Sequence, residues 1–247
     1  MPSAEPALIF LPGLGDPAAW WFTVPSGEGA RPHWQGNTRA GEPGVATALA
    51  PSVRVIAHDR AGVGSNPAPD HNRGWPELYA ELEAVFQSAQ LACPPVLIGH
   101  SLGGLIAYSY AKRHPGRLSG LVLLDPTPPP LAPKPHGPMP ERLALTHFGP
   151  EEVAPNALGG LPLLIIAPGQ AEPDPERRTR FHQRRRQHEQ LFATSARSRA
   201  VWTSQAGHYV HLDSPDVVTE AVLEFWRTIR QDREPVPEPP ATPDEGV

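Results

Sequence analysis

The serine at position 101 has the neighbours that a nucleophilic hydroxyl requires. It lies between Gly99 and Gly103 in the segment GHSLGG (99–104), with an apolar run before it and an apolar, helix-like stretch after it. A sharp turn from a strand into a helix strains its central residue, and flanking glycines lack the Cβ atoms that would collide there. Such a turn presents the hydroxyl at the carboxyl end of the sheet, beside the positive end of a helix. We therefore predict that Ser101 is a nucleophile.

A serine hydroxyl is a weak nucleophile and needs a nearby base. Among the eleven histidines, His208 lies in the segment AGHYVHLDSP (206–215), after the last expected strand and before the last expected helix. It is therefore expected at the same end of the sheet as Ser101. His211 is the alternative, but it follows three residues later, where the chain starts into the helix. With an ordinary imidazole as base, activity should rise with pH through about 6–7.

The oxyanion that develops during acyl transfer needs fixed N–H donors. The first is expected to be the backbone N–H of Leu102, which follows the nucleophile. The second is expected in the segment LPGLG (11–15) after the first strand, where Gly13 permits close approach and Leu14 offers its N–H. These glycines do not have the spacing of a dinucleotide-binding G-x-G-x-x-G motif. We predict an oxyanion hole made by Leu14 and Leu102.

The histidine in turn needs a carboxylate that holds its tautomer. Asp125 ends the run LVLLD (121–125), at the tip of the strand next to the nucleophile's own strand. Glu172 and Asp174 follow the next strand, in a proline-rich connection that leads to an arginine-rich stretch. We favour Asp125, because its position needs no loop to carry it to the site. Glu172 and Asp174 remain open as alternatives.

The elements that position these residues can be read from apolar patterns. Short apolar runs with little alternation are typical of parallel strands buried on both faces. Apolar residues at helical spacing predict helices between them. The alternation predicts an α/β fold with a doubly wound, mostly parallel sheet of about six strands. The expected strands span 7–11, 53–58, 95–99, 121–124, 161–167 and 199–204, and the expected helices span 75–91, 102–113 and 215–230.

Two proline-rich segments interrupt this alternation. Residues 126–160 are expected to form a short lid, with a short helix around 140–148. The tail 232–247 has almost no apolar side chain to bury, and we expect it to be disordered. We therefore expect one domain over 1–231, with the lid inserted in it, followed by the tail.

Composition restricts the partners. A net charge of -5 gives no general attraction to nucleic acid or to an anionic membrane. No run approaches the roughly 20 apolar residues of a membrane span, and the first residues lack the pattern of a signal peptide. We expect a cytoplasmic protein whose partner is a small-molecule acyl substrate, with the oligomeric state left open.

Six arginines between 177 and 186 could bind an acidic partner. We favour a solvated helix face instead, with Phe181, Leu191 and Phe192 facing inward. The arginines are Arg177, Arg178, Arg180, Arg184, Arg185 and Arg186.

The chain resembles the α/β-hydrolase superfamily over about residues 7–230. The resemblance implies a serine-hydrolase triad in the chain order Ser, Asp, His, an oxyanion hole and a lid after the fourth strand. Asp59 is expected to brace the oxyanion loop. The landmarks are LPGLG (11–15), HDRAGVGSNP (58–67), GHSLGG (99–104), HPGRLSGLVLLDP (114–126) and AGHYVHLDSPDVV (206–218).

The chain also departs from the family pattern. Pro12 stands where many relatives have histidine, an N-terminal β-hairpin is not expected, and the lid is short. Most relatives keep their acid after the fifth strand, where this chain has the irregular segment PGQAEPD (168–174). Relatives with an LVLLDP-like strand end and no clear acid there use the earlier position, which is Asp125 in this sequence.

These residues predict hydrolysis of a carboxylic ester or similar acyl compound through an acyl-enzyme intermediate, with no metal or organic cofactor. Thioesterase, lactonase, amidase and carbon–carbon bond hydrolase are alternatives on the same residues. A non-enzymatic ligand-binding protein on this fold is the alternative of another class. Trp20, Trp21 and Trp34 either line an apolar acyl pocket or pack under a loop.

Overall fold

The computed structural model describes residues 5–26, 39–129, 140–145, 150–169 and 175–233. These residues form a six-stranded sheet in the order β2-β1-β3-β4-β5-β6, and every pair of neighbouring strands is parallel. All six expected strands are present, and the predicted doubly wound α/β fold is confirmed. The strands are β1 (Leu8–Leu11), β2 (Val55–Ala57), β3 (Val96–His100), β4 (Gly120–Leu124), β5 (Leu163–Pro168) and β6 (Ser198–Thr203).

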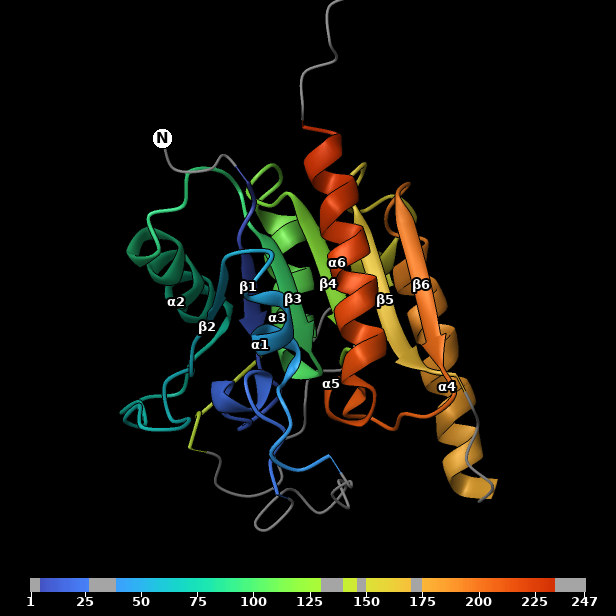
Figure 1. Cartoon of the computed structure of the whole chain (residues 1–247), viewed down its shortest axis with the longest axis horizontal. Helices are drawn as coiled ribbons and strands as arrows, with labels where there is room; N and C mark the ends of the chain where they lie inside the picture. The colour runs from blue at the N-terminus through green and yellow to red at the C-terminus, as the bar shows by residue number, and fades with distance from the viewer. Residues whose placement is uncertain (1–4, 27–38, 130–139, 146–149, 170–174, 234–247) are drawn as a thin grey trace, which may run out of the picture.

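Helices cover both faces of the sheet (Figure 1). One face is covered by α1 (Val45–Leu49) and α6 (Pro215–Gln231), and the other by α2 (Trp75–Ser88), α3 (Leu102–Arg113) and α4 (Pro175–Phe192). Shorter helical turns are η1 (Ala18–Trp21), η2 (Pro150–Val153) and α5 (Val210–Asp213). The helices expected over 75–91, 102–113 and 215–230 correspond to α2, α3 and α6.

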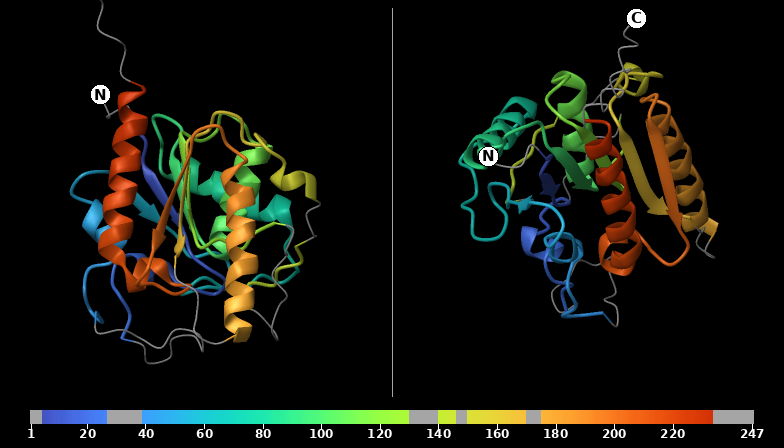
Figure 2. Two further views of the ribbon diagram at one scale, coloured as in Figure 1. Left: turned by 90° about the vertical axis from the view of Figure 1, so that its right-hand side faces the viewer. Right: turned by 45° about the horizontal axis from the view of Figure 1, so that its top comes forward.

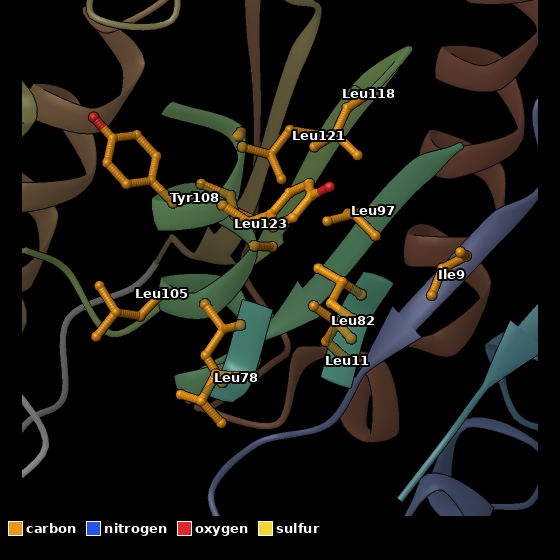
Figure 3. Packing of buried hydrophobic residues seen from close by; sticks show 14 of the residues in the cluster. Ile9, Leu11, Leu78, Leu82, Leu97, Leu105, Tyr108, Leu118, Leu121 and Leu123 are labelled. Carbon is orange, nitrogen blue, oxygen red and sulfur yellow. The ribbon is translucent and has the colours of Figure 1, made fainter. Parts of the chain in front are cut away.

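Alternate strand residues pack into separate cores on the two faces, as period-two side chains must. On the α2–α3 face, Ile9 and Leu97 of the sheet pack with Leu82 of α2 and Leu105 of α3 (Figure 3). Leu8, Phe10 and the other alternate residues pack against α1 and α6. Burial on both faces explains why the strands are continuous apolar runs.

The strand order reverses between β1 and β3, because the chain adds β2 on one side of β1 and all later strands on the other. Ligand crevices of open α/β sheets lie at such a switch point, beyond the carboxyl ends of the strands. The loop after β1 and the turn after β3 meet there. The topology therefore places the expected ligand crevice beside residues 12–17 and Ser101.

Some expected details differ. Residues 140–145 form a turn and a single bridge between Leu143 and Arg73 rather than a helix. Phe192 is exposed instead of facing inward, whereas Leu191 is buried. The expected lid 126–160 and the tail 232–247 lie partly or mostly outside the described residues. In the described part of the chain, no helix has the length and apolar character to cross a membrane.

Candidate active site

Ser101 lies in the turn between β3 and α3. Its φ of 51° and ψ of −115° fall where non-glycine residues are rarely found. Glycine is required beside it, because a Cβ on Gly99 would collide with the carbonyl of Gly103. The Ser101 N–H donates to the Leu124 carbonyl of the neighbouring strand at 3.1 Å. The turn therefore holds the serine in a strained conformation at the carboxyl end of β3.

His208 comes from the loop after β6 and reaches Ser101. Its Nε2 lies 3.1 Å from Ser101 Oγ, and its Nδ1 lies 2.5 Å from Oδ2 of Asp125. An ionised carboxylate only accepts hydrogen bonds, so Nδ1 carries the proton and Nε2 can accept the serine proton. The side chain of His208 is 30% exposed, so this edge of the site is open to solvent.

Asp125 directly follows β4 and is almost completely buried. Its φ of 35° is also in the left-handed region, and its N–H donates to the Ile166 carbonyl of β5 at 2.8 Å. The structure brings Asp125, one of the three acids that the sequence suggests, to His208. Glu172 and Asp174 lie outside the described residues.

Burial and charge affect the acid and the base differently. Burial raises the pKa of Asp125, but Arg184 and His208 lower it more, so the carboxyl has a pKa below its usual value. Burial lowers the pKa of His208 to about 4, and the Asp125 carboxylate opposes this shift. At neutral pH the pair therefore consists of a neutral imidazole and an ionised carboxylate.

The other histidines near Ser101 have different surroundings. His100 donates from Nε2 to the His208 carbonyl at 2.9 Å and so holds the loop that carries the base. His211, the alternative base, is buried and stacks on Trp21 with 4.3 Å between the ring centroids. The structure thus brings His208 to Ser101, whereas His211 packs against the core.

The loop after β1 lies against the first turn of α3. A Cβ on Gly103 would collide with the Leu11 carbonyl, so the two backbones are in close approach. Leu102 is the first residue of α3, and the first N–H groups of a helix have no acceptor within it. Leu14 follows in the adjoining loop. The structure brings the two predicted segments together, and the binding of an oxyanion by Leu14 and Leu102 remains a prediction.

A buried ion pair that sequence reasoning missed fixes the conformation of this loop. Arg60 Nε lies 2.7 Å from Oε2 of Glu141, and both side chains are buried. Arg60 also donates to the carbonyls of Pro12 and Gly13 at 2.7 and 2.6 Å, and the Gly15 N–H donates to Glu141 at 2.5 Å. We call these two side chains, Arg60 and Glu141, the loop clamp. Arg60 thus donates to two carbonyl groups of the loop backbone, and Glu141 accepts from one of its N–H groups.

One signal for the loop clamp was present in the sequence. Arg60 follows Asp59 in the glycine-rich segment after β2, a position that brings it close to the loop after β1. Asp59 has a smaller part in the same region, because its Oδ1 accepts the Ala18 N–H at 2.6 Å where η1 begins. No sequence signal pointed to Glu141, which lies in the segment expected to be the lid.

The tryptophans have different environments. Trp21 is buried against Phe10 and is part of the core, so it does not line an acyl pocket. Trp20 is half-buried and packs edge-on against Tyr209, the residue after His208. Trp34 lies outside the described residues.

The arrangement can activate a hydroxyl for attack on an acyl carbon. It consists of a strained serine, a neutral imidazole within hydrogen-bond distance, a buried carboxylate behind the imidazole and a helix N-terminus next to the serine. Across the ranges that the structure describes, no three His, Cys, Asp or Glu side chains are grouped so that they could hold a metal ion.

Comparison with known proteins agrees with the observed fold. Residues 8–192 match the alpha/beta hydrolase family, a range that includes Ser101 and Asp125 and ends before His208. The chain is 24% identical over 201 residues to the uncharacterized protein YqjL of Bacillus subtilis, and the match covers 74% of this chain and 76% of YqjL. It is 36% identical over 84 residues to a pimeloyl-[acyl-carrier protein] methyl ester esterase of Chromobacterium violaceum, and this match covers 34% of this chain and 31% of the esterase.

Similarity to solved structures covers more of the chain. The carboxylesterase CesB of Bacillus subtilis has a TM-score of 0.61 and 17% sequence identity, and the match covers 91% of this chain and 84% of CesB. At this level of identity, the similarity shows that the two chains share a fold.

Proposed function

Because the chain belongs to the alpha/beta hydrolase family and its relatives include a methyl ester esterase, we propose that it cleaves a carboxylic ester or a related acyl compound through an acyl-enzyme intermediate. Ser101 is the proposed nucleophile, His208 the general base and Asp125 the acid that orients it. The observation that carries the proposal is the continuous chain of contacts from Ser101 Oγ through His208 to the buried Asp125.

In the proposed reaction, Ser101 Oγ attacks the acyl carbon while Nε2 of His208 takes the serine proton. The imidazolium that forms is stabilised by the ionised Asp125, to which its Nδ1–H donates. The negative charge on the acyl oxygen is held by the N–H groups of Leu102 and Leu14. His208 then gives its proton to the leaving group, and a water molecule, activated by the same imidazole, hydrolyses the acyl-serine.

The first test is labelling by a fluorophosphonate probe, which reacts rapidly only with an activated serine. The wild-type protein should be labelled, and Ser101→Ala should lose labelling and roughly 10⁴-fold or more in turnover. Ser204→Ala is a matched control, since Ser204 is exposed in the loop after β6. Circular dichroism should show that both variants are folded. Labelling that persists at another serine in Ser101→Ala would refute the proposal.

The acyl group is tested with p-nitrophenyl esters of graded chain length, with thioesters, lactones and amides assayed in parallel. The partial identity with a methyl ester esterase favours esters. A thioester or lactone turned over at least about tenfold faster than every ester would keep the serine mechanism and replace the proposed substrate class.

A further inference from the structure

Two basic side chains of α4 face the oxygen of Asp125 that His208 does not use. Arg184 Nε lies 3.2 Å and His188 Nε2 lies 3.4 Å from Asp125 Oδ1, while Oδ2 is bound by His208. Arg184 and His188 are four residues apart and thus on one side of the helix. This helix lies alongside β5 and β6, and its first turns extend beyond the carboxyl end of the sheet (Figures 1 and 2). It therefore covers the outer side of the proposed acid.

Of these two groups, Arg184 provides the positive charge at neutral pH. His188 is buried, and burial lowers its pKa, so its imidazole is neutral. Arg184 is 38% exposed and carries a guanidinium charge. Neither contact with Asp125 Oδ1 has the geometry of a hydrogen bond. Arg184 therefore acts on Asp125 as a nearby charge rather than as an aligned donor.

The three consecutive arginines of α4 have different contacts. The guanidinium of Arg185 lies 3.3 Å from the centre of the Trp202 ring, and its Nε lies 3.2 Å from Glu189. Arg186 is exposed on the helix surface. In this run, Arg184 is the one that faces Asp125, so the run is not simply a solvated face.

The space around Asp125 Oδ1 is too small for ordinary hydration. The hollow between Asp125 and α4 has a volume of about 20 Å³, and Pro168 and Phe181 form its apolar walls. A hollow of this size holds about one water molecule. A buried carboxylate that so little water can reach is stable only when the protein compensates its charge.

From this placement we propose that Arg184 is a positioning residue, whose charge holds the ionised Asp125 carboxylate with Oδ2 toward His208 and therefore keeps His208 oriented toward Ser101. The inference rests on the proposed function, because orientation of His208 matters only where His208 serves Ser101. Arg184 does not touch the reacting atoms, and its effect reaches them through Asp125.

The sign of the effect follows from the charges that surround the pair. Asp125 is faced by His208 from the loop after β6 and by Arg184 and His188 from α4. His208 is faced by Asp125 and by His100. The positive charge of Arg184 opposes the addition of a proton to this pair, so its removal should raise the pKa of His208.

The test compares Arg184→Gln and Arg184→Lys with Arg186→Gln, which removes the same charge from an exposed position on α4. The pKa of His208 is measured by ¹⁵N NMR titration of histidine-labelled protein, with the His208→Gln spectrum used for assignment. In Arg184→Gln we expect the pKa of His208 to rise by about 0.5–1 unit. We also expect kcat to fall about tenfold with little change in KM.

Arg184→Lys should return the pKa of His208 and kcat most of the way to their wild-type values, because a charge rather than a hydrogen-bond geometry is required. Arg186→Gln should match the wild type. If Arg184→Gln and Arg186→Gln give the same His208 titration, or if lysine fails to restore it in a folded protein, the inference is refuted.

The outcome is distinguishable from failure of the proposed function. If Ser101 is not labelled by the fluorophosphonate probe, the proposed function fails, and the NMR titration still measures whether Arg184 acts on the pair. If Ser101 is labelled and the His208 titration does not respond to Arg184, the proposed function stands and the role of Arg184 does not.

Discussion

On one side of Ser101, the loop after β1 is held by Arg60 and Glu141, whose side chains are 3% and 0% exposed. On the other side, His208 is 30% exposed, and the charge that faces Asp125 comes from Arg184, which is 38% exposed. The two sides therefore differ in how strongly solvent can affect them. The loop clamp is buried and paired, whereas His208 and Arg184, which lie on either side of the buried Asp125, are partly exposed to solvent.

The difference corresponds to what each side is proposed to do. Oxyanion donors act by being fixed before charge develops, so they benefit from a rigid, buried support. An acid–base pair has to gain and lose a proton in every cycle, and a partly exposed environment permits this exchange. Changes on the first side should therefore affect stability as well as rate, and changes on the second side should mainly affect rate and pH dependence.

The largest effect is expected from a substitution of Asp125, which lies between His208 and Arg184. We call these three residues the acid–base side of Ser101. Asp125→Asn keeps the shape of the side chain but favours the wrong tautomer of His208, so kcat should fall by about 10³–10⁴. The melting temperature should change little, so the loss of rate is not explained by unfolding. Steady-state kinetics and thermal unfolding measure both quantities.

Glu172→Gln and Asp174→Asn are the controls, and each should cost less than about tenfold in kcat. If Asp125→Asn stays near the wild-type rate while one of the other two collapses, the role of the acid moves to that residue.

Breaking the loop clamp should show the opposite balance. Arg60→Met leaves the Glu141 carboxylate buried without its partner, which typically costs about 3–5 kcal/mol in the free energy of unfolding. The displaced loop should lower kcat by about 10–100-fold. Urea denaturation and kinetics measure the two effects.

Arg199→Met is the matched control, because Arg199 pairs with Glu224 at the surface and should cost less than about 1 kcal/mol. The double variant Arg60→Met with Glu141→Met should regain stability without regaining rate. An unchanged unfolding free energy in Arg60→Met would show that the clamp does not hold the loop.

The contrast between these sides also explains what the sequence could and could not predict. The six strands follow from local apolar runs, and Ser101 follows from glycines on either side of it. His208 and Asp125 were suggested because parallel strands bring their carboxyl ends to one edge. These inferences need only local patterns and the topology of a parallel sheet.

The supports of the site depend on long-range contacts. Arg60 and Glu141 are 81 residues apart, and nothing local to Glu141 indicates its partner. The sequence shows Arg184 as part of a charged run, but its contact with Asp125 depends on how α4 packs over the sheet. The pH range in which activity should rise also differs from the range of about 6–7 that the sequence predicts. The partial burial of His208, which lowers its pKa, could not be deduced from its neighbours in sequence.

The pH dependence should reflect the acid–base side alone. His208 must be neutral to accept the serine proton, and burial lowers its pKa to about 4. Activity should therefore rise as pH increases through about 4–5 and be near its maximum by about pH 6, below the range of an ordinary imidazole. The measurement is kcat/KM against pH with a substrate that does not titrate in this range, with tryptophan fluorescence as a check on folding. A midpoint at pH 6–7 would show that Asp125 outweighs the effect of burial.

The smallest expected effect is that of salt concentration on the pH dependence. It compares the partly exposed Arg184 with the buried Arg60. Arg184 is partly exposed, so mobile ions can screen its charge, whereas Arg60 is buried and protected from them. In the wild type, screening weakens the effect of Arg184 on His208. The difference in acid midpoint between wild type and Arg184→Gln should therefore shrink by about 0.2–0.4 pH unit between ~0.05 and ~1 M NaCl. This comparison removes the general effect of salt on a protein of net charge -5, because both proteins experience it.

The destabilisation caused by Arg60→Met should stay the same over the same salt range. A difference between wild type and Arg184→Gln that does not change with salt would mean that Arg184 is as protected from solvent as Arg60. The two sides of Ser101 would then be supported in the same way.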